Sequence, residues 1–560
     1  MASKSSSVMG RVVVILTLGV TLGACRHGIL ISGQGSVTSM TGGRDCASGE
    51  CRFDIEGRYL ETYTATPAAG WLFDAWENCQ TPQGNVCNFD ITANVIEEQQ
   101  GVEVPSAVAR FRRPIEPLFR NVNGDFELPD GSATNQLRWL LGELASSNTS
   151  LSEINAHFHP DFLAQIPAAT IRDEIAAMRA EISDPVIDDL ITATPVYTRG
   201  IIAQRGQTSG AMFISLNTNY GDGVDDGLIT SLSWTPGFFT DGSNVTPEFA
   251  NANLSSLGQS VRGLATNTAM LVASIENDRC KGIYGHNAQL SYPTGSIFKL
   301  WVLGALAEEI RKGRISPSAM VAMKSDEYAQ GGAINNVAPG TQIPLAQMAN
   351  LMLGVSDNTA TDHIHDLIPR NRLEKILGRF NNKNKSDLTP FLSVNEQFHV
   401  GFSLTPAKAR AYANGSDSEQ RTILTNDIEP LGPLTAFPHN NWDELLESSW
   451  SASAFDVCQA YAGLRTYDNR SEAFELLDQA AGADAVLLSL RKRWDRVWQK
   501  GGSLATVDGN FVFTLSWLLE SDDKGAYVVV IMLNNPDLSP VDHLPAFNIA
   551  ARVEQIVHDR

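Results

Sequence analysis

The stretch that decides the fold runs from residue 293 to residue 307 and reads PTGSIFKLWVLGALA. Proline, threonine and glycine end the preceding segment, and Ile297 then begins a helix predicted to reach Ala307. That helix is apolar on every side except at Lys299, and such a helix is buried in a core. Ser296 therefore lies at a buried helix N-terminus, where unpaired backbone N–H groups and the helix dipole stabilise a developing negative charge.

Lys299 follows Ser296 by three residues, which places both side chains on one helix face, one turn apart. A lysine in apolar surroundings favours its neutral form and can accept the proton of a serine hydroxyl. The pattern Ser-x-x-Lys is weak on its own, because the chain contains a second copy, Ser489-Leu490-Arg491-Lys492. That copy has no turn before it and no partner motif after it, so we expect Ser296 to be the nucleophile and Lys299 its base.

Two further motifs follow in order along the chain. Ser356-Asp357-Asn358 lies about sixty residues after Ser296, inside LMLGVSDNTATD at 351–362. Taken alone, this tripeptide is also a plain N-cap before a helix. Lys500-Gly501-Gly502-Ser503 comes just before a predicted edge strand near the C-terminus.

The three motifs in this order resemble the S-x-x-K, S-D-N and K-T-G set of class A β-lactamases and penicillin-binding proteins, with Gly501 in place of the threonine. The resemblance implies a serine hydrolase that opens a small-molecule β-lactam, or a related amide or ester, through an acyl-enzyme on Ser296. It also implies that Ser356 passes protons between Lys299 and the leaving nitrogen, while Asn358 holds a substrate amide.

The same resemblance assigns the remaining contacts of the site. Lys500 and the Ser503 hydroxyl are expected to bind the substrate carboxylate, and the backbone N–H groups of Ser296 and Ser503 to form the oxyanion hole. Class A enzymes also use a glutamate to activate the deacylating water. Glu396, in PFLSVNE at 390–396, falls about where that residue would lie, but the Glu-x-x-Leu-Asn pattern is absent. Glu396 is thus either a deacylating base or a structural residue, and without a base turnover slows.

The Lys-Gly-Gly-Ser variant and the 390–396 segment are similar to a subgroup of this family that includes a β-lactamase-like protein of clavulanate biosynthesis and related lipoproteins. That subgroup pairs the hydrolase with a preceding α+β cone similar to steroid isomerases and nuclear transport factors. The resemblance implies a cone at residues 134–238 and a β-lactamase-like hydrolase domain at 248–560. We expect the hydrolase to have an α/β (α+β) fold, in which helices flank an antiparallel sheet.

Hydrophobic periodicity predicts the elements of both regions. In the first region, Leu137, Leu140, Leu141 and Leu144 share one helix face, a second helical stretch covers 152–182, and strands cover 208–216 and 228–234. In the second, a helix includes Leu254, Leu257 and Val261, a hairpin covers 270–285, strands cover 511–518 and 526–532, and a last helix begins near Ala546. Strands at both ends of this region predict one sheet closed by both chain ends.

The N-terminus is typical of an export signal, with basic residues before a short apolar run at 12–22 that cannot span a bilayer. Residues 22–25 read LGAC and resemble the lipobox of bacterial lipoproteins; an ordinary secretory signal with a chance cysteine is the alternative. The resemblance implies a signal peptide at 1–24, a lipid on Cys25 and anchoring in a lipid bilayer. An exported lipoprotein at the outer membrane or cell surface is expected.

Residues 25–112 combine glycine, threonine and alternating β-formers, which predicts a small all-β module before a linker at 113–133. TATPAAGWLFDAW at 64–76 resembles the bacterial surface repeat related to the internalin B repeat, which implies a spacer or adhesive contact with a surface or cell wall. Short loops favour the pairs Cys46–Cys51 and Cys79–Cys87 over zinc, since no CxxC is present. The pairing of Cys280 and Cys458 stays open.

A formal net charge of −21 argues against a nucleic-acid partner, which needs clustered lysine and arginine. Histidine pairs at 157/159 and 363/365 and a polar turn at 217–226 lack the spacing of metal ligands, so no metal and no cofactor are expected. Two functions stay open: an active serine hydrolase, with a D,D-peptidase or esterase on the same fold as variants, and a surface binding or sensor protein with slow or lost turnover.

Overall fold

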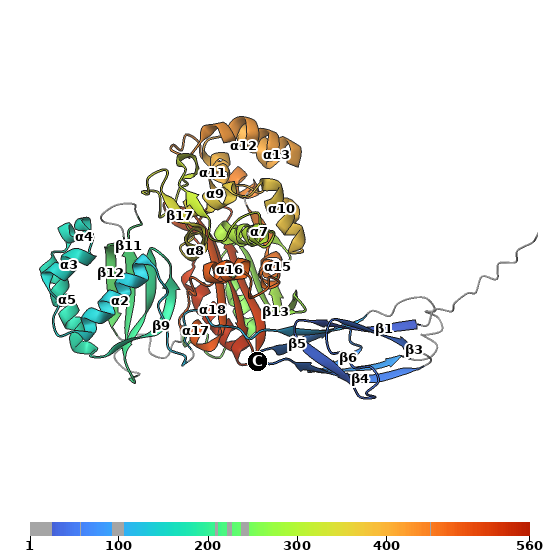
Figure 1. Cartoon of the computed structure of the whole chain (residues 1–560). Coiled ribbons are helices and arrows are strands. Elements are labelled where there is room, and N and C mark those ends of the chain that lie inside the picture. The colour runs from blue at the N-terminus through green and yellow to red at the C-terminus, as the bar shows by residue number, and fades with distance from the viewer. Residues whose placement is uncertain are drawn as a thin grey trace, which may run out of the picture. The chain divides into compact units, whose positions relative to one another are not determined.

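The structure, a computed structural model, divides into two compact units, Met1–Pro114 and Ile115–Arg560 (Figure 1). It describes residues 25–55, 58–91, 106–121, 123–207, 211–220, 227–236, 246–448 and 450–560. The predicted signal peptide and the Cys25 side chain lie outside the described residues, as do Asp222, Asp225 and Asp226 of the polar turn. In the described part of the chain, no helix is long and apolar enough to cross a membrane.

The N-terminal unit is built from strands in two four-stranded sheets, ordered β3–β1–β8–β5 and β2–β4–β7–β6. Alternate residues of β4, among them Tyr59, Tyr63 and Ala65, are buried in its core, as the period of a strand with one inward face requires. Disulfides join Cys46 to Cys51 and Cys79 to Cys87, the two local pairs expected. The bounds are β1 Cys25–Ser32, β2 Gly35–Ser39, β3 Glu50–Ile55, β4 Tyr59–Pro67, β5 Leu72–Glu77, β6 Thr81–Gln83, β7 Val86–Ile91 and β8 Ala107–Arg112.

The second unit begins with a segment that follows its surface. The Ile115 N–H donates to the Asp522 carboxylate at 3.1 Å, and Arg120 donates to the Trp494 carbonyl at 3.3 Å. In the described part of 115–131, an isolated bridge pairs Arg120 with Phe126, and no helix or longer strand forms. Side-chain and backbone bonds rather than secondary structure therefore hold this segment in place.

In the described part of residues 132–236, here named the four-strand module, a four-stranded antiparallel sheet, ordered β12–β11–β10–β9, lies with four helices. Leu137, Leu140 and Leu144 of α2 are buried against this sheet. The single helical stretch expected at 152–182 is wrong: three helices occupy it, because Pro160 and Pro167 each lack the N–H that a continuing helix needs. The bounds are α2 Ser132–Ala145, α3 Leu151–His157, α4 Pro160–Gln165, α5 Ala168–Glu181, β9 Pro185–Ala193, β10 Tyr197–Gln204, β11 Met212–Thr218 and β12 Ile229–Pro236.

A five-stranded antiparallel sheet, ordered β14–β13–β21–β20–β19, organises residues 254–560, here named the five-strand module. The predicted first helix, hairpin, last strands and last helix are confirmed, and β13 pairs with β21, so both chain ends close one sheet. The sheet and its two flanking helices have the bounds α6 Leu254–Arg262, β13 Asn267–Glu276, β14 Arg279–His286, β19 Arg496–Thr506, β20 Gly509–Ser521, β21 Gly525–Asn534 and α18 Leu544–His558.

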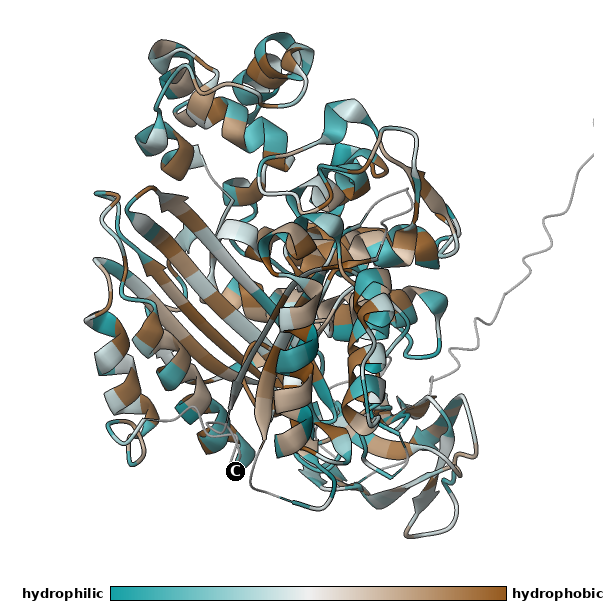
Figure 2. Cartoon of the chain, turned by 90° about the vertical axis from the view of Figure 1, so that its left-hand side faces the viewer, coloured by the Kyte–Doolittle hydropathy of each residue, from teal (hydrophilic) through white to brown (hydrophobic). Residues whose placement is uncertain are grey.

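Helices cover both faces of this sheet. Along β13, Ala269, Leu271 and Ala273 point into one core with the central helices, while Met270 and Val272 point into the other with α6 and α18. Helices in Figure 2 carry brown and teal bands, as expected of helices with one buried face. The other elements are β15 Ser291–Pro293, α7 Lys299–Arg311, β16 Met320–Ala322, β17 Gln342–Pro344, α8 Leu345–Gly354, α9 Asn358–Asp366, α10 Arg370–Arg379, α11 Val394–Phe402, α12 Pro406–Ala413, α13 Asp417–Ile423, α14 Trp442–Ser448, β18 Ser451–Ser453, α15 Ala454–Arg465, α16 Glu472–Ala481 and α17 Leu490–Arg493.

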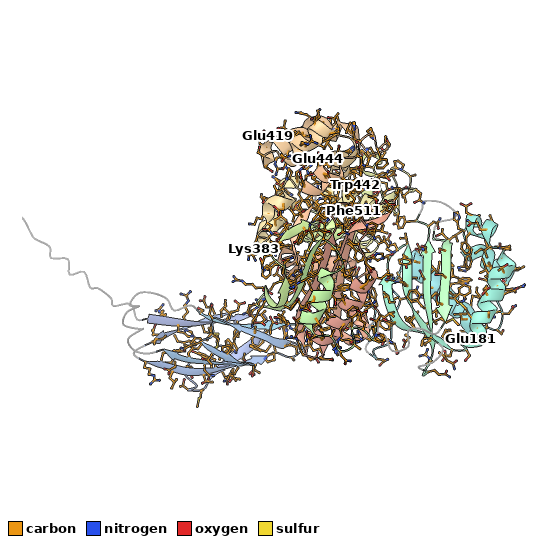
Figure 3. All side chains as sticks on the ribbon, turned by 180° about the vertical axis from the view of Figure 1, so that it is seen from behind. Glu181, Lys383, Glu419, Trp442, Glu444 and Phe511 are labelled. Carbon is orange, nitrogen blue, oxygen red and sulfur yellow. A yellow bond between two sulfur atoms is a disulfide. The ribbon has the colours of Figure 1, made fainter. Side chains whose placement is uncertain are left out.

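Long-range contacts tie the middle of this module to the sheet. Trp442 of α14 packs edge-on against Phe511 of β20 with 5.1 Å between ring centroids, and both are labelled in Figure 3. A disulfide joins Cys280 of β14 to Cys458 of α15, the pairing that the sequence left open. The helices inserted between the second and third motifs therefore contact the sheet at two places, α14 at the start of β20 and α15 at the start of β14.

The two modules are bonded to each other along an edge of the small sheet. The Ala193 N–H donates to the Ala483 carbonyl at 2.8 Å, and the Ala485 N–H donates to the Ile191 carbonyl at 2.9 Å. Val196, in the turn after β9, is buried in the core of the five-strand module. The four-strand module is thus anchored by backbone bonds and by a side chain that belongs to its neighbour's core.

Candidate active site

The nucleophile predicted from the sequence lies in a tight turn before α7. A 3₁₀ turn, Gly295–Phe298, precedes the α-helix, which starts at Lys299 rather than at the expected Ile297 and continues to Arg311. Gly295 has a φ of +51°, a conformation that glycine adopts without strain. Ser296 is half-buried, whereas Ile297, Phe298 and Lys299 are buried, so the turn presents the serine at the surface of the core.

This turn lies directly against the third motif, which is in the edge strand β19 and not before it as predicted. A Cβ on Gly502 would lie 2.2 Å from the Thr294 carbonyl oxygen and 2.5 Å from the Ser296 nitrogen. A Cβ on Gly295 would lie 2.5 Å from the Ser503 nitrogen. Only glycines allow the backbones to approach so closely, and the approach brings the amides of Ser296 and Ser503 to one junction.

Lys299 is fully buried, and its ammonium group is bonded to the second motif. Its Nζ donates to the Ser356 carbonyl at 2.6 Å, to the Ser356 Oγ at 3.2 Å and to the Asn358 Oδ1 at 2.8 Å. Burial, with the nearby charge of Lys500, holds the pKa of Lys299 well below its ordinary value of 10.5. A lysine with such a pKa can serve as a base near neutral pH.

Ser356 connects the two lysines of the site. Its φ is +58°, and its Oγ accepts from the Lys500 Nζ at 3.0 Å as well as from Lys299. Lys500 also donates to the Gly501 carbonyl at 2.8 Å, and burial lowers its pKa to about 7. The strained backbone at Ser356 places one hydroxyl between two amines, an arrangement suited to passing a proton.

Asp357 anchors this motif as the N-cap of α9, which confirms the N-cap that the tripeptide alone predicts. Its buried carboxylate accepts from the backbone N–H groups of Ala333, Ile334 and Ala360, the last as N-cap of α9. Burial raises the pKa of Asp357 despite these bonds. The aspartate of the motif indicates this role in the sequence, since aspartate favours N-caps.

Asn358 and Ser503, the other residues predicted to bind substrate, differ in how far they are engaged by the protein itself. Both polar atoms of the Asn358 side chain are engaged, because its Nδ2 also donates to the Gln330 carbonyl at 2.5 Å. Ser503 is exposed on β19, beside the nucleophile turn. The structure thus brings Ser296, Lys299 and the second and third motifs into one cluster.

Glu396 is held apart from that cluster by its own partners. It closes a capping box at the start of α11, where it accepts from the Ser393 N–H at 2.8 Å. Arg370 donates to both of its carboxylate oxygens, at 2.5 and 3.0 Å. Although burial opposes ionisation, the bonds and charge of Arg370 lower the pKa of Glu396, which stays anionic in a buried ion pair.

A cavity of about 430 Å³ is lined by residues of all three motifs. Ser296, Ser356 and Lys500 lie on its wall, as do Gly501, Gly502 and Ser503 of β19. Its lining also includes Tyr197 of the four-strand module and Asp484 from the loop after α16, neither of which any sequence motif indicated. A larger cavity of about 620 Å³ lies beside α2 and β9, and its lining is of other residues.

The histidines considered as metal ligands have other partners. The His363 Nε2 accepts from the Lys324 N–H at 2.8 Å, and the His365 Nε2 lies 3.2 Å from the Phe391 carbonyl oxygen. Among the described residues, no group of three His, Cys, Asp or Glu side chains is arranged to hold a metal ion.

Residues 259–425 match the family model described as "Beta-lactamase enzyme family". The chain carries a β-lactamase-family domain. Residues 128–183 match a second family model, "ORF 12 gene product N-terminal". No curated protein matches the chain in sequence.

Several solved structures are similar to this chain at low identity. A β-lactamase from Chitinophaga pinensis is 13% identical, with 54% of this chain and 98% of that chain covered and a TM-score of 0.36. The structure of PBP-A is 15% identical, with coverage of 55% and 96% and a TM-score of 0.35. A class A β-lactamase described as the last common ancestor of Gram-negative bacteria is 13% identical, with coverage of 54% and 97% and a TM-score of 0.38.

Proposed function

We propose that this protein is a serine hydrolase of the β-lactamase kind, which opens a β-lactam or a related amide or ester through an acyl-enzyme on Ser296. The observation that carries the proposal is the buried Lys299, bonded to Ser356 and Asn358 and one turn after the half-exposed serine. A buried lysine of lowered pKa beside a serine hydroxyl is the combination that nucleophilic catalysis requires.

In the proposed acylation, the neutral Lys299 amine takes the proton of Ser296, and the serine Oγ attacks the carbonyl carbon. The bond from that carbon to the leaving nitrogen breaks, and the nitrogen receives a proton from Lys299 through the Ser356 hydroxyl. The Ser356 Oγ is 3.2 Å from the Lys299 Nζ, which supports this relay. The amides of Ser296 and Ser503 would stabilise the negative charge on the carbonyl oxygen.

A chromogenic cephalosporin tests the proposal. We expect the purified protein to gain a mass equal to that of the intact cephalosporin, on Ser296, and the Ser296→Ala variant to gain none. Ser489→Ala is the matched control, because Ser489 begins the other Ser-x-x-Lys copy and is expected to react like the unmodified protein. The proposal is wrong if neither a cephalosporin nor a simple activated ester modifies Ser296.

One observation favours the second candidate function, a binding or sensor protein with slow turnover. Both oxygens of Glu396 are bonded to Arg370, and one also caps Ser393, so this carboxylate lacks a free oxygen for a deacylating water. A protein that acylates quickly and deacylates slowly would act as a sensor or binding protein. Rapid formation of the Ser296 adduct followed by its persistence for hours favours this function, whereas continuous release of product favours the hydrolase.

Glu396→Gln separates the two functions further. Glutamine can still cap the helix but cannot act as a base, so an enzyme that uses Glu396 in deacylation would lose turnover by roughly 10²-fold or more. If the adduct forms and decays at rates within about threefold of the unmodified protein, Glu396 is structural. Thermal unfolding of the same variant reports the loss of its ion pair with Arg370.

We also propose that the chain is an exported lipoprotein, acylated on Cys25, with a surface repeat at 25–112 and a steroid-isomerase-like cone at 134–238. The LGAC sequence at 22–25 supports the first part, and the family match over 128–183 supports a separate domain before the hydrolase. Incorporation of a labelled fatty acid into the protein, and its absence from Cys25→Ala, tests the anchor.

A further inference from the structure

The catalytic cavity extends beyond the three motifs, across the edge strand β19. Lys500 lies opposite Ser516, whose hydroxyl is on the catalytic face of the sheet, where it contacts Tyr461. Gly501 lies opposite Leu515, which is buried in the other core, with α6 and α18. The cavity is lined by residues of both faces, so it wraps around the strand where its two glycines lie.

Gly501 keeps this passage open. A Cβ there would lie 3.3 Å from the Gln499 Nε2 and the Thr514 carbonyl oxygen, so a small side chain fits tightly but would fill the space. Beyond Gly501 the lining is apolar, formed by half-buried Val486, Phe513 and Phe547 and by buried Leu515. We name these four residues the apolar annex.

Tyr197 of the four-strand module closes the same cavity and is firmly held. The preceding Val196 is buried in the five-strand module's core, and Tyr197 packs against that core. The Ser215 hydroxyl on β11 donates to the Tyr197 hydroxyl at 3.1 Å. The ring is therefore a fixed wall rather than a free surface side chain.

Asp484, which belongs to the five-strand module, bonds to the four-strand module and so holds this wall of the cavity in place. Its Oδ1 accepts from the Thr192 hydroxyl at 2.8 Å and the Val486 N–H at 3.0 Å, and lies 3.4 Å from an Arg199 nitrogen. The charge of Asp484 also opposes the lowering of the Lys500 pKa. The four-strand module therefore holds both the loop that carries Val486 and the carboxylate that acts on Lys500.

We propose that the four-strand module supplies a wall of the substrate site, and that the apolar annex with Tyr197 receives an apolar substituent of the substrate, attached beside the carboxylate that Lys500 binds. This inference rests on the proposed function, because it places the substrate by its acyl carbon at Ser296 and its carboxylate at Lys500. Lys500 and Gly501 are consecutive in β19, so a group next to that carboxylate reaches the glycine gap. Burying an aromatic group there favours substrates that carry one.

Two cephalosporins with the same C7 side chain test the inference. One carries a methyl group and the other a styryl group at C3, the ring carbon next to the one that bears the carboxylate. The measured quantity is the ratio of their second-order rate constants for acylation of Ser296, styryl over methyl. We expect a ratio of about ten in the unmodified protein, equivalent to burial of less than half of the aromatic group. Gly501→Thr should lower the ratio at least fivefold by filling the gap.

Tyrosine variants separate the wall from the module contact. Tyr197→Ala should lower the ratio at least threefold, whereas Tyr197→Phe should retain it because the ring stays. Tyr220→Ala is the matched control, since Tyr220 belongs to the same module, packs on the same core and bonds to Gln347 at 2.6 Å without lining the cavity. Its ratio should stay within twofold of the unmodified protein.

The outcomes distinguish the inference from the proposed function. If both cephalosporins acylate Ser296 and the ratio is near one, or is the same in Gly501→Thr and Tyr197→Ala, the inference is overturned and the hydrolase remains. If neither compound forms an adduct with the unmodified protein, the proposed function fails and the inference with it. The ratio of the dissociation constants of the two compounds for Ser296→Ala measures the same preference without acylation. A slow reaction therefore cannot conceal the result.

Discussion

The two Ser-x-x-Lys segments of this chain have the same pattern and opposite surroundings. Ser296 lies in a 3₁₀ turn after Gly295 and precedes a helix that is buried from Lys299 to Ala307. Ser489 has a left-handed backbone and precedes a single helical turn, α17. The four letters alone therefore do not distinguish a catalytic pair from a structural one.

The lysines show the difference most clearly. Lys299 is fully buried among Ser356 and Asn358, which moves its pKa well below 10.5. Lys492 is exposed and pairs with Asp188 at 2.7 Å. In the second copy the buried cation is Arg491, which donates to the carbonyls of Leu190, Ile191 and Gly482 and so joins the two modules. Burial lowers the pKa of Lys299, as its proposed role as a base requires, whereas Lys492 is a charge on the surface.

Replacing each lysine gives the largest expected contrast. Lys299→Met should slow acylation of Ser296 by roughly 10³-fold, as expected when a general base is removed. Lys492→Met should leave the rate within twofold. Adduct formation followed by mass spectrometry measures both. Equal rates in the two variants would break the comparison, because the buried lysine would then have no catalytic role.

Replacing Arg491 tests whether the second Ser-x-x-Lys copy has a structural role. Arg491→Met removes one donor from each of three buried carbonyls, of which that of Ile191 keeps the Ala485 N–H, and should lower the free energy of unfolding by about 3 kcal/mol. Lys492→Met, one residue away, should change it by less than about 0.5 kcal/mol. Urea unfolding measures both values. A stable Arg491→Met protein would show that backbone bonds such as Ala193 to Ala483 suffice to hold the modules.

The pH dependence of Lys500 gives the smallest effect. An amine is charged below its pKa, and the pKa of Lys500 is about 7, so its hold on a substrate carboxylate weakens as the pH rises above 7. We expect kcat/KM for an anionic cephalosporin to fall between pH 7 and 8 by up to about fivefold. An uncharged ester should lack this decline, and Lys500→Arg should remove it, because a guanidinium stays charged.

Much of the candidate site could be predicted from sequence. The order of the three motifs singled out Ser296, Lys299 and Ser356, and the hydrophobic pattern predicted β13, β14, β20 and β21 of the large sheet but missed the edge strand β19. Glu396 could not be placed, because its partner Arg370 lies 26 residues earlier and its bond depends on how α10 and α11 pack. The prediction of one helical stretch at 152–182 was wrong because it followed the hydrophobic periodicity and disregarded Pro160 and Pro167.

The sequence by itself determined which side chains form the candidate site, because a serine, a lysine three residues later and a turn before a buried helix are local properties. Only the tertiary structure decided which residues surround them. It set the burial that shifts the pKa of Lys500, and it brought Tyr197 into the cavity from the preceding module. Burial and cavity walls depend on contacts between residues far apart in the chain, and such contacts leave no local pattern to recognise.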